Sequence, residues 1–102
     1  FLNTSIHSPV PTVLMEAMAS GCAVVSTNNC MIPEIIQHGE NGLLADTADE
    51  LRSSCQYLLD NPSKARELGE AAKKTMQDKF NLQRFVDDWN NLLFSVIDNY
   101  RK

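Results

Sequence analysis

The sequence predicts an α/β fold in which a Rossmann-like parallel sheet is flanked by helices. Short apolar runs that suit buried strands, such as CAVVS at 22–26, alternate with longer segments of helical periodicity. About three such runs accompany four or five helical segments. Because a parallel sheet usually needs more strands to cover its edges, the chain is expected to form the second half of a larger sheet domain.

The composition is that of an ordinary globular domain. The 102 residues suffice for one small core, and 43% hydrophobic with 22% charged residues argues against disorder. A net charge of -4 disfavours a nucleic-acid partner. No segment approaches the ~20 apolar residues of a membrane span, so no transmembrane segment is expected.

The cysteines indicate a reducing compartment. Their number is odd and no CxxC spacing occurs, which predicts small buried thiols in a cytoplasmic protein, with neither disulfides nor a zinc site. The three are Cys22, Cys30 and Cys55.

The first helix is predicted over about 11–20, between a strand end at 1–5 and a strand at about 23–26. Proline has no amide to lose in a first turn, so Pro11 followed by Thr12 marks the start. Gly21 marks the end, because glycine accepts the left-handed conformation of many helix ends. An apolar stripe at helical spacing predicts the buried face: Val13, Leu14, Ala17 and Met18.

The middle of the chain predicts a helix, a strand and another helix. The short helix begins at Pro33 with Gly39 as its stop, and a buried strand covers 43–45. Thr47 and Glu50 form a capping box, in which the two side chains close each other's free amides. The helix that follows ends at Asn61-Pro62, and its predicted core face consists of Leu51, Cys55, Leu58 and Leu59.

Two more helices are predicted at the end of the chain. Ser63 caps the first, which runs to about Lys79, and Asn81 caps the last. The last helix carries a wide apolar stripe that predicts a core face: Phe85, Trp89, Leu92, Leu93, Val96, Ile97 and Tyr100. With an incomplete sheet, uncovered apolar faces and an exposed strand edge favour self-association.

The start of the first helix is the candidate site. Free amides there carry about half a positive charge and attract anions. Glu16 lies one turn further, off the apolar stripe. Its carboxylate either accepts hydrogen bonds from sugar hydroxyls or is an exposed helix glutamate without a partner.

Four segments carry a resemblance to a known family. They are SPVPTVLMEAMASGCAVVST at 8–27, IPEIIQHGENGLLAD at 32–46, LLDNPSKARELGEAAKKT at 58–75 and KFNLQRFVDDWNNLL at 79–93. Together they resemble the retaining nucleotide-sugar glycosyltransferases of the GT-B fold known as glycosyl transferases group 1. The resemblance implies that residues 1–102 form a single partial nucleotide-sugar-binding domain, the C-terminal half of the donor-binding domain with a long C-terminal helix. It also implies a missing N-terminal domain that binds the acceptor.

The resemblance implies roles for the candidate residues. Two glutamates separated by seven residues mark the family's donor site, and Glu16 matches the second, which accepts hydrogen bonds from the ribose. The amides of the loop and first turn would face the pyrophosphate: Pro9, Val10, Pro11, Thr12 and Val13 mark this segment. Ser8 stands at the place of the first glutamate, which contacts the donor sugar.

Serine at that place leaves three explanations open, and no residue is assigned as catalytic with certainty. Serine is uncharged and cannot stabilise positive charge on the sugar ring. The sugar is bound differently, catalysis is weaker, or His7 substitutes for the glutamate.

Other residues near the site either have two possible roles or are expected to be structural. The loop 28–31, which comprises Asn28, Asn29, Cys30 and Met31, either contacts the sugar or is a plain loop. Glu34 is expected to be a helix-start charge and His38 to satisfy a helix end. No metal site and no cofactor are expected, because the resemblance implies that protein donors hold the diphosphate.

The sequence therefore predicts the donor-binding part of an enzyme that moves a sugar from a nucleoside diphosphate donor to a glycan, lipid or small-molecule acceptor. The isolated chain is expected to be inactive. Two alternatives stay open: a nucleotide-sugar epimerase of the same architecture, and a non-catalytic module that binds a nucleotide or a protein.

Overall fold

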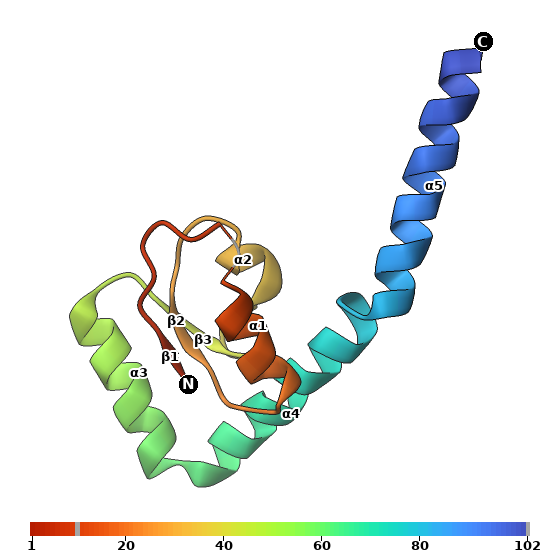
Figure 1. Cartoon of the computed structure of the whole chain (residues 1–102). Coiled ribbons are helices and arrows are strands. Elements are labelled where there is room, and N and C mark those ends of the chain that lie inside the picture. Colours follow the sequence, from red (N-terminus) through yellow and green to blue (C-terminus); the bar gives the residue numbers. More distant parts are fainter. Residues whose placement is uncertain (10, 102) are drawn as a thin grey trace.

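A computed structural model describes residues 1–9 and 11–101, and its centre is a parallel sheet of three strands in the order β1-β2-β3 (Figure 1). The strands are β1 (Leu2–Asn3), β2 (Val25–Thr27) and β3 (Leu43–Ala45). Leu2 pairs with Val25, and Val25 in turn pairs with Leu43. The predicted parallel sheet is confirmed, and β3 has the bounds expected from the sequence.

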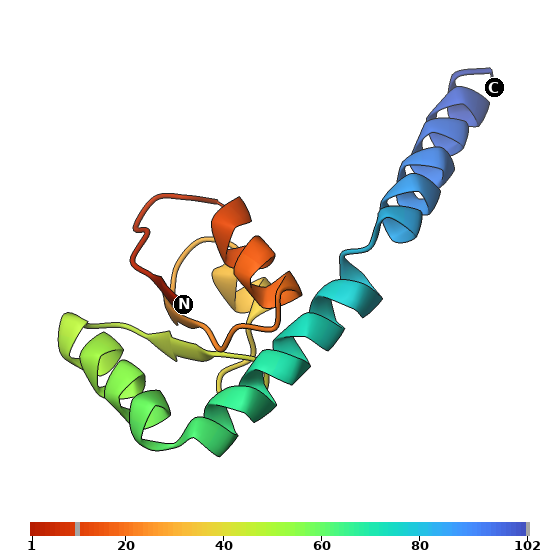
Figure 2. The same ribbon diagram turned by 60° about the horizontal axis from the view of Figure 1, so that its bottom comes forward.

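The described residues form five helices, of which the first four pack around the sheet. They are α1 (Thr12–Ala19), α2 (Ile32–Ile35), α3 (Ala48–Asp60), α4 (Pro62–Lys79) and α5 (Leu82–Arg101). Figures 1 and 2 show α1 and α3 on opposite sides of the sheet, with α4 running from the end of α3 past α1. The fold is thus an α/β arrangement with helices on both faces, as expected for buried parallel strands.

The core has two parts because neighbouring strand residues point to opposite faces. Val24 joins the cluster beneath α1, whereas Val25 joins the one beneath α3. The first cluster comprises Leu14, Ala17, Met18, Val24, Ile32, Ile35, Ile36, Ala72 and Met76. The second comprises Val25, Leu43 and Leu68, with Leu51, Cys55 and Leu58 of α3 packed against it.

α1 begins and ends close to the predicted residues. Pro11 occupies the N-cap position, and its carbonyl accepts from the amide of Leu14 at 3.1 Å. At the other end Gly21 has a φ of +83°, and its amide donates to Met18. This left-handed ending is the role predicted for Gly21. Val13 is the exception on the predicted stripe, since its side chain is 57% exposed.

The predicted stop of α2 was wrong. The helix ends at Ile35, four positions before Gly39, and Ile36 is already extended. The buried side chain of Asn41 explains the early end: its Oδ1 accepts from the amide of Gln37 at 2.8 Å, and its Nδ2 donates to the carbonyl of Ile35 at 3.1 Å. Gly39 does adopt a positive φ, in the turn that follows.

The start of α3 is capped differently from the predicted box. Thr47 Oγ1 accepts from the amide of Glu50 at 3.1 Å, as expected for an N-cap. The Glu50 carboxylate, however, accepts from the amide of Asp46 at 2.7 Å and not from that of Thr47. On the predicted core face Leu59 was wrong, because it is 74% exposed.

Two predictions about α4 and the cysteines need correction. Ser63 is not a cap, because α4 begins one residue earlier at Pro62 and the helix already runs through position 63. Cys22 and Cys30 are exposed and Cys55 is partly buried, since they lie in loops and on a half-covered helix face. All three are free thiols.

The last helix, α5, leaves the body of the molecule (Figures 1 and 2). Asn81 caps it as predicted, with Oδ1 accepting from the amide of Arg84 at 2.8 Å. The prediction that its apolar stripe is core was wrong for this chain, because no side chain of α5 is buried. Among the described residues, no helix has both the length and the apolar character needed to cross a bilayer.

Candidate functional site

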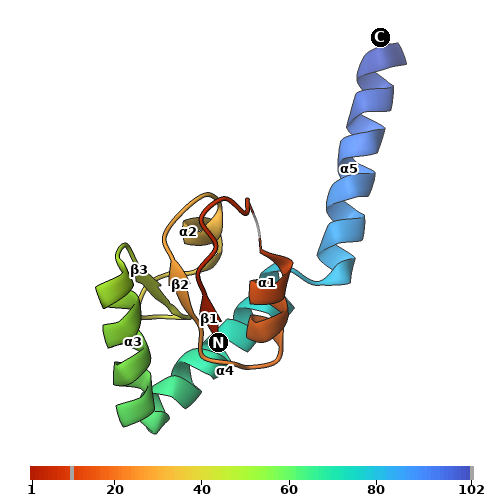
Figure 3. The same ribbon diagram turned by 60° about the vertical axis from the view of Figure 1, so that its left-hand side comes forward.

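Two loops meet at the carboxyl edge of the sheet, the edge where open α/β sheets bind ligands. Residues 4–9 follow β1 and residues 28–31 follow β2, and the two segments lie side by side (Figure 3). Ser8 is partly buried, whereas His7 and Pro9 are exposed. Val10, also predicted to belong to the site, lies outside the described residues.

The start of α1 stands next to the first of these loops. Pro11 has an extended backbone with a φ of -68°, and its side chain offers no acceptor to the helix amides. Thr12 and Val13 are exposed, so the backbone of the first turn is close to solvent. The first amides of a helix have no partner within the helix, and its dipole favours an anion at this end.

The two loops are joined by a backbone hydrogen bond in which the amide of Met31 donates to the carbonyl of Pro9 at 3.1 Å. Beside it, Cys30 has a φ of +49°, in the left-handed region that non-glycine residues seldom adopt. The predicted loops are therefore brought together. Met31 takes part through its backbone amide, a role the sequence did not indicate.

A second set of contacts lies deeper between the same loops, and the sequence analysis missed it. The carbonyl of Ser5 accepts from Thr27 Oγ1 at 2.6 Å and from Asn29 Nδ2 at 2.9 Å. The hydroxyl of Ser5 donates to Asn3 Oδ1 at 2.9 Å, and Asn3 Nδ2 donates to Ser26 Oγ at 3.0 Å. We call Asn3, Ser5, Ser26, Thr27 and Asn29 the Ser5 network. Its only sequence signal is the set of polar residues at the ends of β1 and β2.

Glu16 lies on the side of α1 that faces α4. Its side chain is exposed and borders a cavity of about 300 Å³ that is also lined by Met15, Ala19, Met76, Gln77 and Phe80. Neither Ser8 nor Pro9 lines this cavity. The structure therefore does not place Glu16 in one cavity with the loop 4–9.

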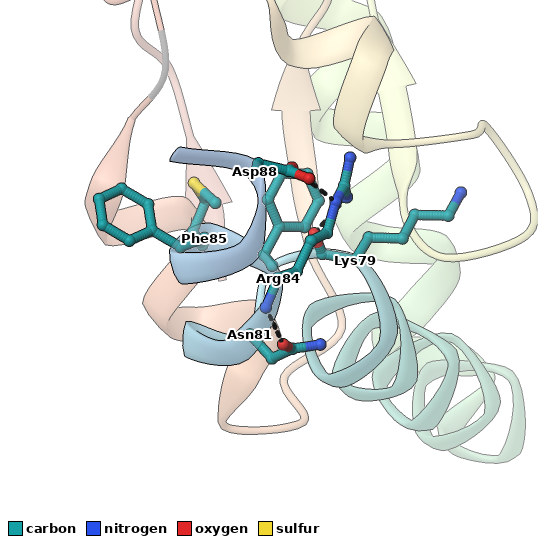
Figure 4. A pocket seen from close by; sticks show the side chains of 7 residues that line it. Lys79, Asn81, Arg84, Phe85 and Asp88 are labelled. Atoms are coloured by element: carbon teal, nitrogen blue, oxygen red, sulfur yellow. Dashed lines mark hydrogen bonds and ion pairs between the residues drawn. The ribbon is translucent and has the colours of Figure 1, made fainter. Parts of the chain in front are cut away.

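A neighbouring cavity of about 380 Å³ lies at the junction of α4 and α5 (Figure 4). Arg84 Nε lies 3.5 Å from Asp88 Oδ2, and its guanidinium also donates to the carbonyl of Lys79. The pair with Asp88 lies within α5, and the bond to the carbonyl of Lys79 joins the start of α5 to the end of α4 on the exposed side of the junction. The lining residues are Met15, Lys79, Phe80, Asn81, Arg84, Phe85 and Asp88.

Three other residues considered in the sequence analysis make contacts that stabilise the fold or lie at a helix start. The side chain of Asn28 donates to Asp46 Oδ1 at 3.2 Å. Glu34 lies in the first turn of α2, the helix-start position predicted for it. His38 does not satisfy a helix end, because its Nδ1 accepts from the amide of Leu44 in β3 at 2.9 Å.

Solved structures with this arrangement define the class of protein. Sucrose-phosphate synthase from Thermosynechococcus elongatus aligns with 96% of this chain and 26% of its own, with a TM-score of 0.87 and 25% identity. Anabaena HepE, solved in complex with UDP, aligns with 92% of this chain and 27% of its own, with a TM-score of 0.85 and 22% identity. The fold is that of the C-terminal part of a GT-B glycosyltransferase.

The family follows from the sequence comparison. The profile described as Glycosyl transferases group 1 matches residues 1–75, and the chain belongs to this family. It is 32% identical over 87 residues to N-acetyl-alpha-D-glucosaminyl L-malate synthase of Bacillus anthracis, covering 83% of this chain and 23% of that protein. Over 98 residues it is 33% identical to the lipopolysaccharide core biosynthesis glycosyltransferase LpsE of Rhizobium meliloti, covering 93% and 28%. The chain thus spans about a quarter of the length of these relatives.

Proposed function

We propose that this chain is the donor-binding part of a retaining glycosyltransferase and that its ligand is a nucleoside diphosphate sugar. The observation that carries the proposal is the start of α1, a helix of 8 residues that opens without a side-chain cap at the carboxyl edge of the sheet. Exposed amides at such an end suit a diphosphate. HepE, a neighbour in fold, was solved with UDP, which supports UDP as the probe.

Each predicted site residue has a task in this proposal. The backbone around 9–13 holds the diphosphate, and the exposed carboxylate of Glu16 accepts hydrogen bonds from the ribose. Ser8 faces the donor sugar. As the bond to the sugar breaks, the diphosphate gains charge, and amides already oriented toward it stabilise that charge more strongly than water does.

The remaining expectations belong to the same proposal. Residues 1–102 act as one partial nucleotide-sugar-binding domain, and a further domain supplies the acceptor site. The three free thiols support a cytoplasmic location. Neither a metal ion nor a cofactor takes part in donor binding.

Calorimetric titration of the chain with UDP and GDP tests the proposal. We expect one of them to bind, and Glu16→Ala to weaken binding by about tenfold, as for a lost hydrogen bond to a charged group. Glu70→Ala, which removes an exposed carboxylate from α4, is the matched control and should bind as the parent does. Equal affinity of the parent and Glu16→Ala would contradict the role of Glu16, and no binding of either nucleotide would reject the donor site.

Ser8 favours a second candidate, a module that binds a nucleotide without transferring a sugar. Serine lacks the charge that would stabilise an oxocarbenium-like sugar. A transfer assay on the isolated chain should give no product under either candidate. Measurable turnover would refute the view that 1–102 is a partial domain.

A further inference from the structure

We propose that Thr27 and Asn29 are positioning residues that hold the loop 4–9 in the shape required by the donor. The inference rests on the proposed function, because it assigns these residues a role in nucleotide binding. Thr27 ends β2, and Asn29, whose side chain contacts Ser5 in the loop 4–9, belongs to the loop that follows. Figure 3 shows the loop after β2 beside the loop after β1. Thr27 is not among the predicted donor contacts, and Asn29 belongs to the loop 28–31, which was expected either to contact the sugar or to be a plain loop.

The loop 4–9 has little means of holding its own shape. Proline has no amide to donate, and this segment and its continuation to α1 contain Pro9 and Pro11. Regular backbone pairing is therefore restricted here, and the backbone must find partners elsewhere. Side-chain donors from the end of β2 and from the loop after it supply them.

The carbonyl of Ser5 receives both of these donors. Thr27 Oγ1 donates to it at 2.6 Å and Asn29 Nδ2 at 2.9 Å, distances of well-formed hydrogen bonds. All three residues are partly buried, so water competes less for the same groups. Two donors from one strand end thus converge on a single oxygen of the loop.

Two further groups of hydrogen bonds hold the loop 4–9, one on the side of β1 and one on the side of α1. On the side of β1, the hydroxyl of Ser5 bonds Asn3, whose buried side chain also donates to the fully buried Ser26. On the side of α1, the carbonyl of Pro9 accepts from the amide of Met31. The loop that carries Ser8 is therefore fixed near both of its ends, just before α1 starts.

The test uses the ¹⁵N-labelled chain, with backbone order parameters measured by NMR and UDP titrated into each variant. Thr27→Val keeps the shape of the side chain and removes its hydroxyl, and Asn29→Ala removes the second donor. Thr27→Ser restores the hydroxyl. Asn28→Ala removes a neighbouring amide side chain that contacts Asp46 instead of Ser5.

In Thr27→Val and Asn29→Ala we expect the order parameters of residues 6–8 to fall from about 0.85 to below about 0.6. UDP affinity should fall about fivefold, the change expected from one lost hydrogen bond. Thr27→Ser and Asn28→Ala should stay within about twofold of the parent, and the β3 amides should keep their parent spectrum in all variants.

The outcomes separate the two proposals. If the parent chain binds UDP and Thr27→Val binds it equally well, the positioning role is wrong and the donor site stands. Order parameters that stay high in both Thr27→Val and Asn29→Ala overturn the positioning role as well. If the parent binds neither UDP nor GDP, the proposed function fails, and the positioning role fails with it.

Discussion

Gly69 in the middle of α4 lies directly against Gly21, which forms the left-handed turn after α1. A Cβ atom at position 69 would lie 2.2 Å from the carbonyl oxygen of Gly21, which is closer than real contacts allow. The two backbones therefore approach as closely as they do only because residue 69 has no side chain. This approach sets how α1 lies on α4, and hence where the start of α1 stands.

Gly69→Ala should destabilise the chain by about 2 kcal/mol, as for overpacking in a core. The expectation runs against helix propensity, which favours alanine over glycine by about 1 kcal/mol. Urea unfolding measures the difference, with Glu70→Ala at the next, exposed position as the control. If the variant is as stable as the parent, α1 and α4 can move apart without loss of stability, and the close contact is not required.

Asn41 is the buried polar residue on which the turn before β3 depends. Besides its bonds to Ile35 and Gln37, its Nδ2 donates to Thr75 Oγ1 of α4 at 3.1 Å. Asn41→Leu keeps the branching of the side chain and removes its hydrogen bonds to the carbonyl of Ile35 and the amide of Gln37, so the free energy of unfolding should fall by about 3 kcal/mol.

Chemical denaturation of Asn41→Leu measures this effect, and Asn28→Ala is the control. Asn28 is exposed, so its replacement should lower the free energy of unfolding by less than about 0.5 kcal/mol. Similar stability of the two variants would show that the turn holds without Asn41.

The exposed face of α5 should make the isolated chain self-associate. Its apolar side chains include Trp89 and Leu93, both about half exposed, and a continuous patch of this kind seeks cover from water. Sedimentation at rising concentration should reveal oligomers, and Leu93→Glu should shift the chain toward monomer. Asn91→Glu adds the same charge on the opposite side of the helix and is the control. A parent chain that stays monomeric at high concentration would contradict this prediction.

Nucleotide binding should not need a divalent metal ion. In the proposed site the backbone amides of the first turn of α1 meet the diphosphate, and their charge does not depend on a cation. UDP affinity should therefore be the same with and without EDTA. Loss of binding in EDTA, with recovery on adding Mg²⁺ or Mn²⁺, would assign the diphosphate to a metal instead.

The sequence predicted those parts of the fold that depend on local patterns. The apolar run around Val24 and the Gly21 helix end give local signals, and both were confirmed. The end of α2 was missed because Asn41 determines it through a contact made only in the folded chain. The stripe on α5 was read correctly as apolar, but periodicity alone does not say what covers a face.

The candidate site likewise has a part that local sequence patterns predict and a part that they do not. The helix start and the loop beside it follow from Pro11 and its neighbours, and the structure brings this loop against Met31. The bonds to Ser5 join residues more than twenty positions apart. No local pattern specifies such a pairing, so the residues that fix the loop became visible only with the strands in register.

Backbone NMR of the chain during a UDP titration tests the donor site most directly. The largest shifts should fall on the amides of Thr12 and Val13, with smaller shifts at Glu16, because the diphosphate lies nearest the first turn of α1. Largest shifts at the α4–α5 junction, around Arg84, would place the nucleotide elsewhere and contradict the site.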